Sequence, residues 1–214
     1  MTKDWTGNSK STFTTLGASS HSDKIRDTND YYATDPNALQ MFLDKVKNDG
    51  GVLNKNIWEC SCGEGHLSKV LEKNGYEVKS TDLIDRGYGQ GGINFLTLNE
   101  PWDGDILTNP PYKYAQEFVE KAISLINIGN KVIMFLRIQF LEGKERYKLF
   151  QTNPPKYVYV HSSRQICAMN GDFVKYDGSA TCFCWFVWEK GFIGDTVIRW
   201  LIEEEKSNEQ NKLF

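Results

Sequence analysis

The segment Asn109-Pro110-Pro111-Tyr112 combines residue types that suit chemistry on a planar amine. The exocyclic amine of a base or an amide is a poor nucleophile because its lone pair is conjugated. The Asn109 side-chain oxygen and the Pro110 carbonyl oxygen can accept hydrogen bonds from both N–H groups, which moves the nitrogen toward a tetrahedral geometry. The prolines hold these acceptors rigidly, and Tyr112 can stack on the planar substrate. The proton can leave to solvent after group transfer, so no strong base is required.

Part of this segment occurs a second time, because residues 152–155 repeat the Thr-Asn-Pro-Pro of residues 108–111. The first copy follows a predicted strand and precedes a predicted helix, and such loops lie at the sheet edge where α/β proteins bind ligands. The second copy follows a helix, precedes a strand and ends in Lys156. We therefore interpret the second copy as a turn at the opposite edge.

A glycine-containing loop is predicted after an earlier strand, with Glu59 at the strand end and Gly63 and Gly65 in the turn. Glycines there allow the backbone to approach a ligand closely. Asp82 ends the next predicted strand, 17 positions after Gly65, where a carboxylate can accept both ribose hydroxyls of a nucleoside. The G-x-G-x-x-G motif of dinucleotide-binding proteins is absent, because Ser68 stands at the position of its third glycine. This pattern suits a nucleoside cofactor with a cationic amino acid portion and no pyrophosphate.

Strand and helix patterns alternate along most of the chain. Thr34 or Asp35 can cap a helix whose first position suits Pro36. The continuous apolar run over 132–136 is typical of a central parallel strand covered on both faces. Strands are expected at 57–60, 76–81, 105–108, 132–136, 157–160 and 180–189, and helices around 39–46, 67–71, 115–126 and 144–150. The alternation predicts an α/β three-layer sandwich with a mostly parallel sheet.

Length and composition are those of one soluble globular domain, since the chain has 214 residues and 40% hydrophobic side chains. We expect a flexible arm over 1–30, one domain over 31–201 and a polar tail over 202–214. The sequence contains no apolar run that is typical of a signal peptide or of a membrane-spanning helix. The C-x-C pairs at 60–62 and 182–184 are interpreted as reduced, packed thiols of a cytoplasmic protein rather than as a metal site. The lone histidines His66 and His161 are not expected to be catalytic.

The charge balance argues against a nucleic-acid protein that binds through its overall field, because the formal net charge is -3. Any such contact requires a local basic patch. Residues 137–164 contain six Lys and Arg against two Glu, a local excess of +4. This segment leaves the predicted ligand-binding edge of the sheet, so it could contact phosphates.

The glycine loop, Asp82 and the Asn-Pro-Pro-Tyr loop, in this order, resemble S-adenosylmethionine-dependent DNA N6-adenine methyltransferases of the small type encoded by phages and prophages. The resemblance covers roughly residues 31–190. It implies a Rossmann-like class I methyltransferase sheet, mostly parallel with an antiparallel edge strand. It also implies S-adenosylmethionine as the cofactor and catalytic roles for Asn109, Pro110, Pro111 and Tyr112.

The resemblance further implies a set of cofactor-binding residues: Tyr32, Thr34, Pro36, Glu59, Cys60, Gly63, Gly65, Asp82, Leu83, Asn94 and Phe95. Two positions depart from the family pattern. Asp35 is interposed in the aromatic-Thr-Pro segment that helps to bind the methionine part of the cofactor. Asn94 stands where an Asp is usual in the pair that borders the cofactor adenine.

DNA is the partner that the resemblance implies, with the target adenine flipped out of the duplex and stacked on Tyr112. Candidate phosphate contacts are Arg137, Lys144, Arg146 and Arg164. The later strands belong to the core, so no separate target-recognition domain fits into the chain. We therefore expect a short or relaxed target sequence, read by the basic segment and the N-terminal arm.

Three alternatives stay open from the sequence. RNA adenine is a possible substrate because RNA methyltransferases also carry the Asn-Pro-Pro-Tyr loop. Protein glutamine is another, although those enzymes usually have a helical domain before the glycine loop and only 58 residues precede Glu59 here. The third is a non-catalytic methyltransferase-like protein that binds nucleic acid or a partner. The target sequence and the oligomeric state do not follow from the sequence.

Overall fold

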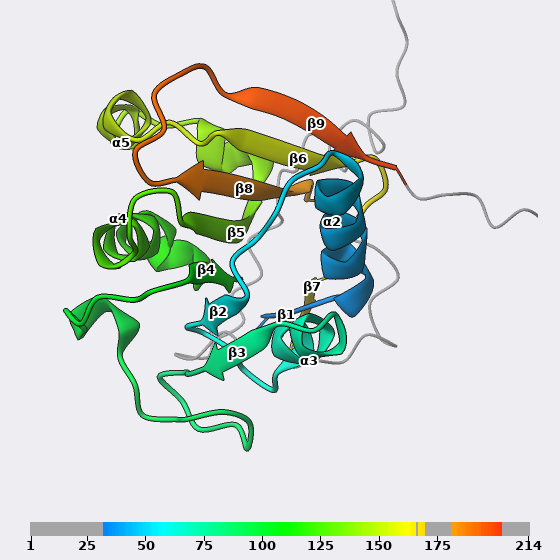
Figure 1. Cartoon of the computed structure of the whole chain (residues 1–214), viewed down its shortest axis with the longest axis vertical. Helices are drawn as coiled ribbons and strands as arrows, with labels where there is room; N and C mark the ends of the chain where they lie inside the picture. Colours follow the sequence, from blue (N-terminus) through cyan, green and yellow to red (C-terminus); the bar gives the residue numbers. More distant parts are fainter. Residues whose placement is uncertain (1–31, 166, 170–180, 203–214) are drawn as a thin grey trace, which may run out of the picture.

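The computed structural model describes residues 32–165, 167–169 and 181–202, and its central feature is a twisted sheet (Figure 1). Within the described residues this sheet has seven strands in the order β3-β2-β4-β5-β8-β6-β9. Their bounds are β2 Asn56–Glu59, β3 Glu77–Ser80, β4 Asp105–Thr108, β5 Lys131–Arg137, β6 Tyr157–His161, β8 Phe183–Glu189 and β9 Val197–Leu201. All neighbouring pairs are parallel except those of β8, which is antiparallel to both β5 and β6.

The predicted fold class is confirmed, but the antiparallel strand is not at the edge of the sheet. Strand β8 lies between β5 and β6, and six of its seven residues are buried. An apolar strand buried on both faces is stable only in the interior of a sheet, because an edge position would expose one of its sides. The edge strand next to β6 is β9, which the sequence did not predict and whose Ile198 and Trp200 are exposed.

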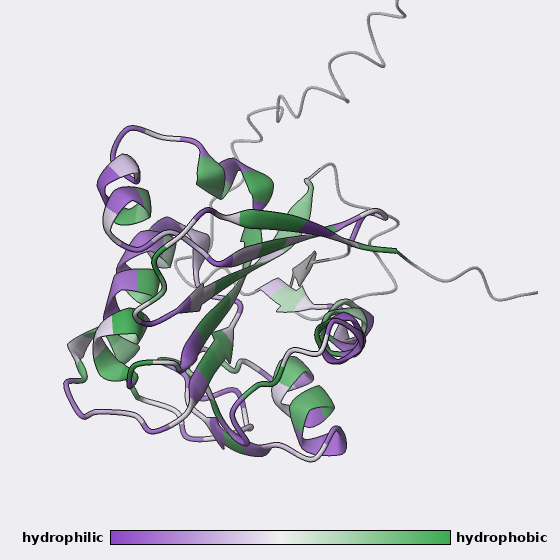
Figure 2. Ribbon diagram, turned by 45° about the horizontal axis from the view of Figure 1, so that its top comes forward, coloured by the Kyte–Doolittle hydropathy of each residue, from purple (hydrophilic) through white to green (hydrophobic). Residues whose placement is uncertain are grey.

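Two helices cover each face of the sheet, which confirms the predicted three layers (Figure 1). The helices α2 (Pro36–Asn48) and α3 (His66–Lys73) lie on one face, and α4 (Ala115–Leu125) and α5 (Tyr147–Thr152) on the other. Alternate residues of β5 point to opposite layers, with Met134 on the α4 side and Phe135 on the α2 side. Figure 2 shows the helices green toward the sheet and purple toward solvent.

The first turn of α2 is anchored as the sequence predicts. Asp35 is the N-cap, its side chain accepts the Asn37 N–H at 2.8 Å, and Pro36 occupies the first turn. The Trp185 indole N–H of β8 donates to the Ala38 carbonyl at 3.1 Å. This bond fixes the start of α2 against the middle of the sheet.

A separate two-stranded sheet, formed by β1 (Tyr32–Thr34) and β7 (Cys167–Met169), was not predicted. The strands pair antiparallel, with Thr34 opposite Cys167. Three-residue strands carry too few positions for a periodic pattern, so the sequence could not reveal them. The pair joins the segment before α2 to the segment after β6.

The whole predicted arm (1–30), Tyr31 and all of the predicted tail (202–214) except Ile202 lie outside the described residues. Over the described part of the chain, no helix has the length and apolarity that crossing a membrane requires. Helix α5 begins three residues later than expected, because Lys144 and Glu145 belong to the loop that Arg146 closes. The Arg146 guanidinium donates to the carbonyl oxygens of Phe140, at 2.8 Å, and Glu142.

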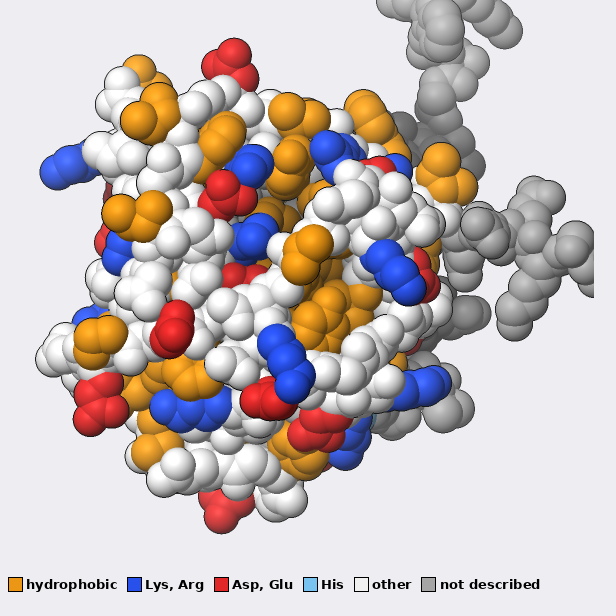
Figure 3. Space-filling model, viewed as in Figure 1, with side chains coloured by type: hydrophobic (Ala, Val, Ile, Leu, Met, Phe, Trp, Pro, Cys, Tyr) orange, Lys and Arg blue, Asp and Glu red, His pale blue; other side chains and the backbone are white. Residues whose placement is uncertain are grey.

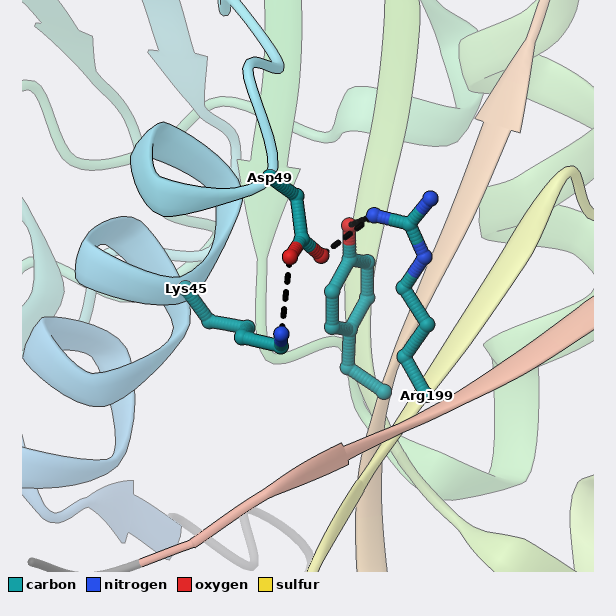
Figure 4. A network of polar contacts seen from close by, with 4 residues as sticks. Lys45, Asp49 and Arg199 are labelled. Atoms are coloured by element: carbon teal, nitrogen blue, oxygen red, sulfur yellow. Dashed lines mark hydrogen bonds and ion pairs between the residues drawn. The ribbon is translucent and has the colours of Figure 1, made fainter.

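An ion-pair network connects the end of α2 to the outer strand β9 (Figure 4). The Asp49 carboxylate accepts from Lys45 Nζ at 2.7 Å and from the Arg199 guanidinium. Arg199 also lies over the Tyr157 ring, 4.3 Å from its centroid. The hydrogen bond from Lys45 and the contact with Arg199 lower the pKa of Asp49.

We predict that Asp49→Asn lowers the free energy of unfolding by about 1 kcal/mol, because it removes the charge that joins both cations. Urea unfolding at low and high salt measures this, and the loss should shrink in high salt. Asp44→Asn is the matched control, since Asp44 lies on the same helix and contacts only Gln40 among the bonds found. Equal midpoints for the two variants would show that the network contributes nothing.

Candidate active site at the carboxyl edge of the sheet

Three loops meet where the neighbouring strands β3, β2 and β4 end. The glycine loop follows β2, Asp82 follows β3, and the Asn109-Pro110-Pro111-Tyr112 segment follows β4. These strands are parallel, so their carboxyl ends share one edge of the sheet. The second Asn-Pro-Pro copy lies between α5 and β6, at the opposite edge, as predicted.

The glycine loop has a backbone that other residues rarely adopt. Gly63 and Gly65 have φ angles of 54° and 77°, in the left-handed region. A Cβ on Gly65 would lie 2.4 Å from the Tyr88 ring, so a side chain has no room there. The Cys62 N–H donates to the Thr81 carbonyl at 3.0 Å, which ties the loop to the end of β3.

The Asp82 carboxylate is directed at the glycine loop. Its Oδ2 accepts the Gly63 N–H at 2.8 Å, and its Oδ1 accepts the Ile84 N–H at 2.9 Å. Each carboxylate oxygen has a second lone pair, so both can accept a further hydrogen bond from a ligand. Leu83 follows with 57% of its surface exposed, an apolar side chain next to these acceptors. The arrangement suits a polyhydroxylated group with an apolar neighbour.

Glu59 lies behind the loop rather than in the open site. Its side chain is 2% exposed and accepts a hydrogen bond from Ser68 of α3, whose hydroxyl is 2.7 Å from that of Ser80 in β3. Burial raises the pKa of Glu59 to about 8. The carboxyl group therefore joins β2, β3 and α3, and its predicted cofactor contact gains no support from this position. Cys60 is buried too, and burial raises the pKa of its thiol.

The Asn109 side chain is held by its nitrogen. Its Nδ2 donates to the Tyr32 carbonyl oxygen at 3.0 Å and to the Thr34 hydroxyl at 2.9 Å. A carbonyl oxygen can only accept, so this partner determines which end of the amide is the nitrogen. The other end, Oδ1, is buried and has no hydrogen-bond partner in the part of the chain that the structure describes. A buried acceptor without a partner is costly, and such groups concentrate at functional sites.

Ser61 links the glycine loop to the end of β4. Its hydroxyl is 2.6 Å from that of Thr108 and donates to the Asn109 carbonyl oxygen at 3.0 Å. The sequence analysis did not single out Ser61, although its place between the two cysteines of the loop marks it as a polar residue near the strand end. Through Ser61, the backbone of Asn109 is fixed to the same loop that faces Asp82.

The Tyr112 ring is surrounded by three side chains from distant parts of the sequence. Its centroid lies 6.2 Å from that of Tyr32 and 5.9 Å from that of Phe183, and the Arg137 guanidinium lies 4.8 Å from it. Tyr112 begins a short 3-10 helix, η2 (Tyr112–Tyr114), that leads directly into α4. Sequence reasoning missed Phe183 because it reads as an ordinary residue of an apolar strand.

The predicted pair Asn94 and Phe95 has structural contacts. The Asn94 side chain accepts the Leu96 N–H at 3.1 Å and caps the 3-10 helix η1 (Phe95–Thr97). Phe95 is buried and packs edge to face on Trp58, with ring centroids 5.3 Å apart. These contacts assign packing to Phe95, and its predicted position beside a cofactor adenine stays a prediction.

The four candidate phosphate contacts have different surroundings. Arg137 is exposed at the end of β5 and lies over Tyr112, whereas the Arg146 guanidinium binds loop carbonyls. Lys144 and Arg164 are exposed in loops on either side of β6. On the face that Figure 3 shows, Lys and Arg side chains are interspersed with Asp and Glu. Arg137 lies beside the Asn-Pro-Pro-Tyr loop, because its guanidinium is over the Tyr112 ring.

The histidines and thiols have surroundings that do not suggest catalysis. His66 begins α3, as expected, and its ring lies 3.3 Å from the Glu64 carboxylate. His161 is buried at the end of β6, and burial lowers its pKa to about 4. Among the described residues, no group of three His, Cys, Asp or Glu side chains could hold a metal ion. The thiols of Cys60, Cys62, Cys182 and Cys184 are free.

Comparison with known proteins found similarity in structure only, since no protein-family model and no curated protein matches the chain. The methyltransferase subunit of a type I restriction-modification system from Streptococcus thermophilus matches with a TM-score of 0.60 at 13% identity, over 81% of this chain and 48% of that chain. A candidate RNA methyltransferase from Pyrococcus horikoshii matches with a TM-score of 0.52 at 14% identity, over 72% and 84%.

A candidate hemolysin from Lactococcus lactis also matches, with a TM-score of 0.51 at 13% identity, over 84% of this chain and 95% of that chain. The chain thus spans about half of the restriction-modification subunit and most of the other two proteins. At these identities the similarity shows the fold. It confirms the expected Rossmann-like sheet of the methyltransferases.

We predict a pH dependence of stability that comes from Glu59. Burial raises its pKa from 4.5 to about 8, so the folded protein keeps a proton that the unfolded chain releases above about pH 4.5. The free energy of unfolding should fall between these two pH values, by at most about 1.4 kcal/mol per pH unit. In Glu59→Gln this contribution should vanish.

Urea unfolding of the wild type, Glu59→Gln and a control variant between about pH 4.5 and pH 8 tests the prediction. Glu120→Gln is the control, because Glu120 is exposed on α4 and contacts Gln116. The control should keep the wild-type slope. A Glu59→Gln profile parallel to that of the wild type would mean that Glu59 is already ionised in the folded protein.

Proposed function

We propose that this protein transfers a methyl group from S-adenosylmethionine to the N6 amine of adenine in DNA. The observation that carries the proposal is the buried Asn109 Oδ1, an acceptor without a partner in the described structure, at the edge where the glycine loop and Asp82 meet. An acceptor held in this way suits an amine donor from a substrate. The fold agrees with S-adenosylmethionine as the cofactor, which supplies an electrophilic methyl group on sulfur when bound.

The residues present fit a nucleoside cofactor with an amino acid portion. Both Asp82 oxygens retain acceptor capacity for ribose hydroxyls, and the exposed Leu83 lies beside them. The left-handed Gly63 and Gly65 give the loop a backbone that a ligand can approach. Tyr32, Thr34 and Pro36 lie in β1 and at the start of α2, where the family pattern expects contacts with the methionine part.

The reaction requires little chemistry from side chains beyond orientation. Asn109 Oδ1 and the Pro110 carbonyl oxygen accept the two N–H groups of the amine, so its lone pair is directed at the methyl group. Bound S-adenosylmethionine would supply the methyl group: the new C–N bond would form as the S–C bond breaks, and the amine proton would then leave to solvent. Tyr112 stacks on the flipped base, with Arg137 over its ring.

DNA is the substrate that we favour, and the type I restriction-modification subunit among the structural neighbours supports it. The segment between β6 and β8 leaves the sheet at the active-site edge, where it could approach nucleic acid. A small protein of the phage type, with the basic segment 137–164 and the N-terminal arm as its candidate readers, is consistent with a short or relaxed target sequence.

RNA adenine is the second candidate, and the candidate RNA methyltransferase among the neighbours favours it. Protein glutamine and non-catalytic binding are the remaining alternatives. Tritiated cofactor offered with unmethylated DNA, ribosomal RNA and release-factor protein separates them. Label in N6-methyladenine of DNA supports the proposal. Label in RNA or protein alone assigns the other substrate, and no label with any of them leaves a binding protein.

We predict that Asn109→Ala reduces kcat by at least about 100-fold, because it removes the acceptor that polarises the amine. The affinity for cofactor should change little, since the side chain acts on the substrate. Asn153→Ala is the matched control, because it alters the second Asn-Pro-Pro copy at the opposite edge. Single-turnover methylation and calorimetry measure both quantities. A fully active Asn109→Ala enzyme would refute the mechanism.

We predict that Asp82→Ala weakens cofactor binding by roughly 10- to 100-fold, since hydrogen bonds to a carboxylate are strong. Asp85→Ala is the control, because Asp85 lies in the same loop and accepts only the Gly87 N–H among the bonds found. Titration calorimetry with S-adenosylmethionine gives the dissociation constants. The assignment of Asp82 fails if both variants bind as the wild type does.

A further inference from the structure

We infer that Thr34 is a positioning residue for the catalytic amide: with the Tyr32 carbonyl it orients the Asn109 side chain so that Oδ1 faces the substrate amine. The inference rests on the proposed function. It assigns Thr34 a role through Asn109, whereas the family pattern assigns it to the cofactor. The contacts are 2.9 Å from Asn109 Nδ2 to the Thr34 hydroxyl and 3.0 Å to the Tyr32 carbonyl oxygen.

An asparagine amide needs such a constraint because its two ends have nearly the same shape. A rotation by half a turn would place Nδ2 where the substrate amine has to donate, and two donors cannot pair. In this protein the rotation would also place Oδ1 against the Tyr32 carbonyl oxygen. The Tyr32 carbonyl oxygen and the Thr34 hydroxyl therefore favour the amide orientation in which Asn109 Oδ1 is left to accept from the substrate.

The anchor itself is rigid. The Thr34 side chain is 2% exposed, and its strand β1 pairs with β7 in register. The next residue, Asp35, caps α2, and the first turn of that helix is bound to the sheet by Trp185. From the other side, Ser61 donates to the Asn109 carbonyl oxygen at 3.0 Å. Asn109 is thus restrained through its backbone and its amide nitrogen, by segments 48 and 75 residues away.

The two roles for Thr34 make opposite kinetic predictions. A positioning residue affects the chemical step, so its loss lowers kcat and leaves the cofactor affinity unchanged. A cofactor ligand affects binding, so its loss raises the dissociation constant and leaves the saturated rate unchanged. Thr34→Val removes the hydroxyl at constant shape. Thr34→Ser keeps the hydroxyl and loses only a methyl group.

The experiment compares Thr34→Val and Thr34→Ser with the wild type, and Thr152→Val serves as the control. Thr152 lies at the end of α5, at the opposite edge, and its hydroxyl donates to the Lys148 carbonyl oxygen. We expect kcat of Thr34→Val to fall about 5- to 10-fold, the effect of one lost hydrogen bond. The dissociation constant of S-adenosylmethionine should stay within about 2-fold, and Thr34→Ser and Thr152→Val should resemble the wild type. A raised dissociation constant with an unchanged kcat overturns the inference.

A second readout does not depend on activity. In NMR spectra of the free protein, the side-chain amide signals of Asn109 are identified by their absence from Asn109→Ala. They should shift in Thr34→Val and keep their positions in Thr34→Ser. Unchanged signals in Thr34→Val overturn the inference even if the wild type is active. A wild type that methylates no substrate refutes the proposed function, and the NMR comparison then still decides whether Thr34 holds the amide.

Discussion

The orientation of one side-chain amide is the constraint on which the candidate site depends. The Asn109 side-chain nitrogen donates a hydrogen bond to β1, and its backbone carbonyl oxygen accepts one from the glycine loop. Its Oδ1 is buried without a partner in the described structure. Leaving a buried acceptor unpaired costs free energy, and the surrounding bonds must offset that cost. Under the proposed function, a substrate amine satisfies this acceptor, and such preorganisation lowers the barrier of a catalysed reaction.

The sheet makes this arrangement possible because it places three loops from distant parts of the sequence side by side. Adjacent parallel strands β3, β2 and β4 end at the same edge, so Asp82, Ser61 and Asn109 lie on neighbouring loops there. Buried bonds behind the loops keep the strands in register. The hydrogen bond from Ser68 to the buried Glu59 is one of them, and it joins α3 to the end of β2.

The sequence predicted where the two candidate loops lie, because Asn109-Pro110-Pro111-Tyr112 and the glycine segment combine unusual residue types with a strand before and a helix after. It also distinguished the second Asn-Pro-Pro copy from the first. It did not predict β1, β7 or the outer strand β9, since short strands carry no period and pair with distant partners. It could not foresee that Thr34 contacts Asn109, because that contact depends on how β1 crosses the edge of the sheet.

The most direct test of the central claim is a crystal structure of the protein with a non-reactive S-adenosylmethionine analogue and a DNA duplex containing adenine. We predict a flipped adenine on Tyr112, with its N6 about 2.7–3.2 Å from Asn109 Oδ1, and Asn109 Nδ2 still bonded to Tyr32 and Thr34. An adenine that is bound elsewhere, or an Asn109 whose Oδ1 faces the protein in the complex, would contradict it.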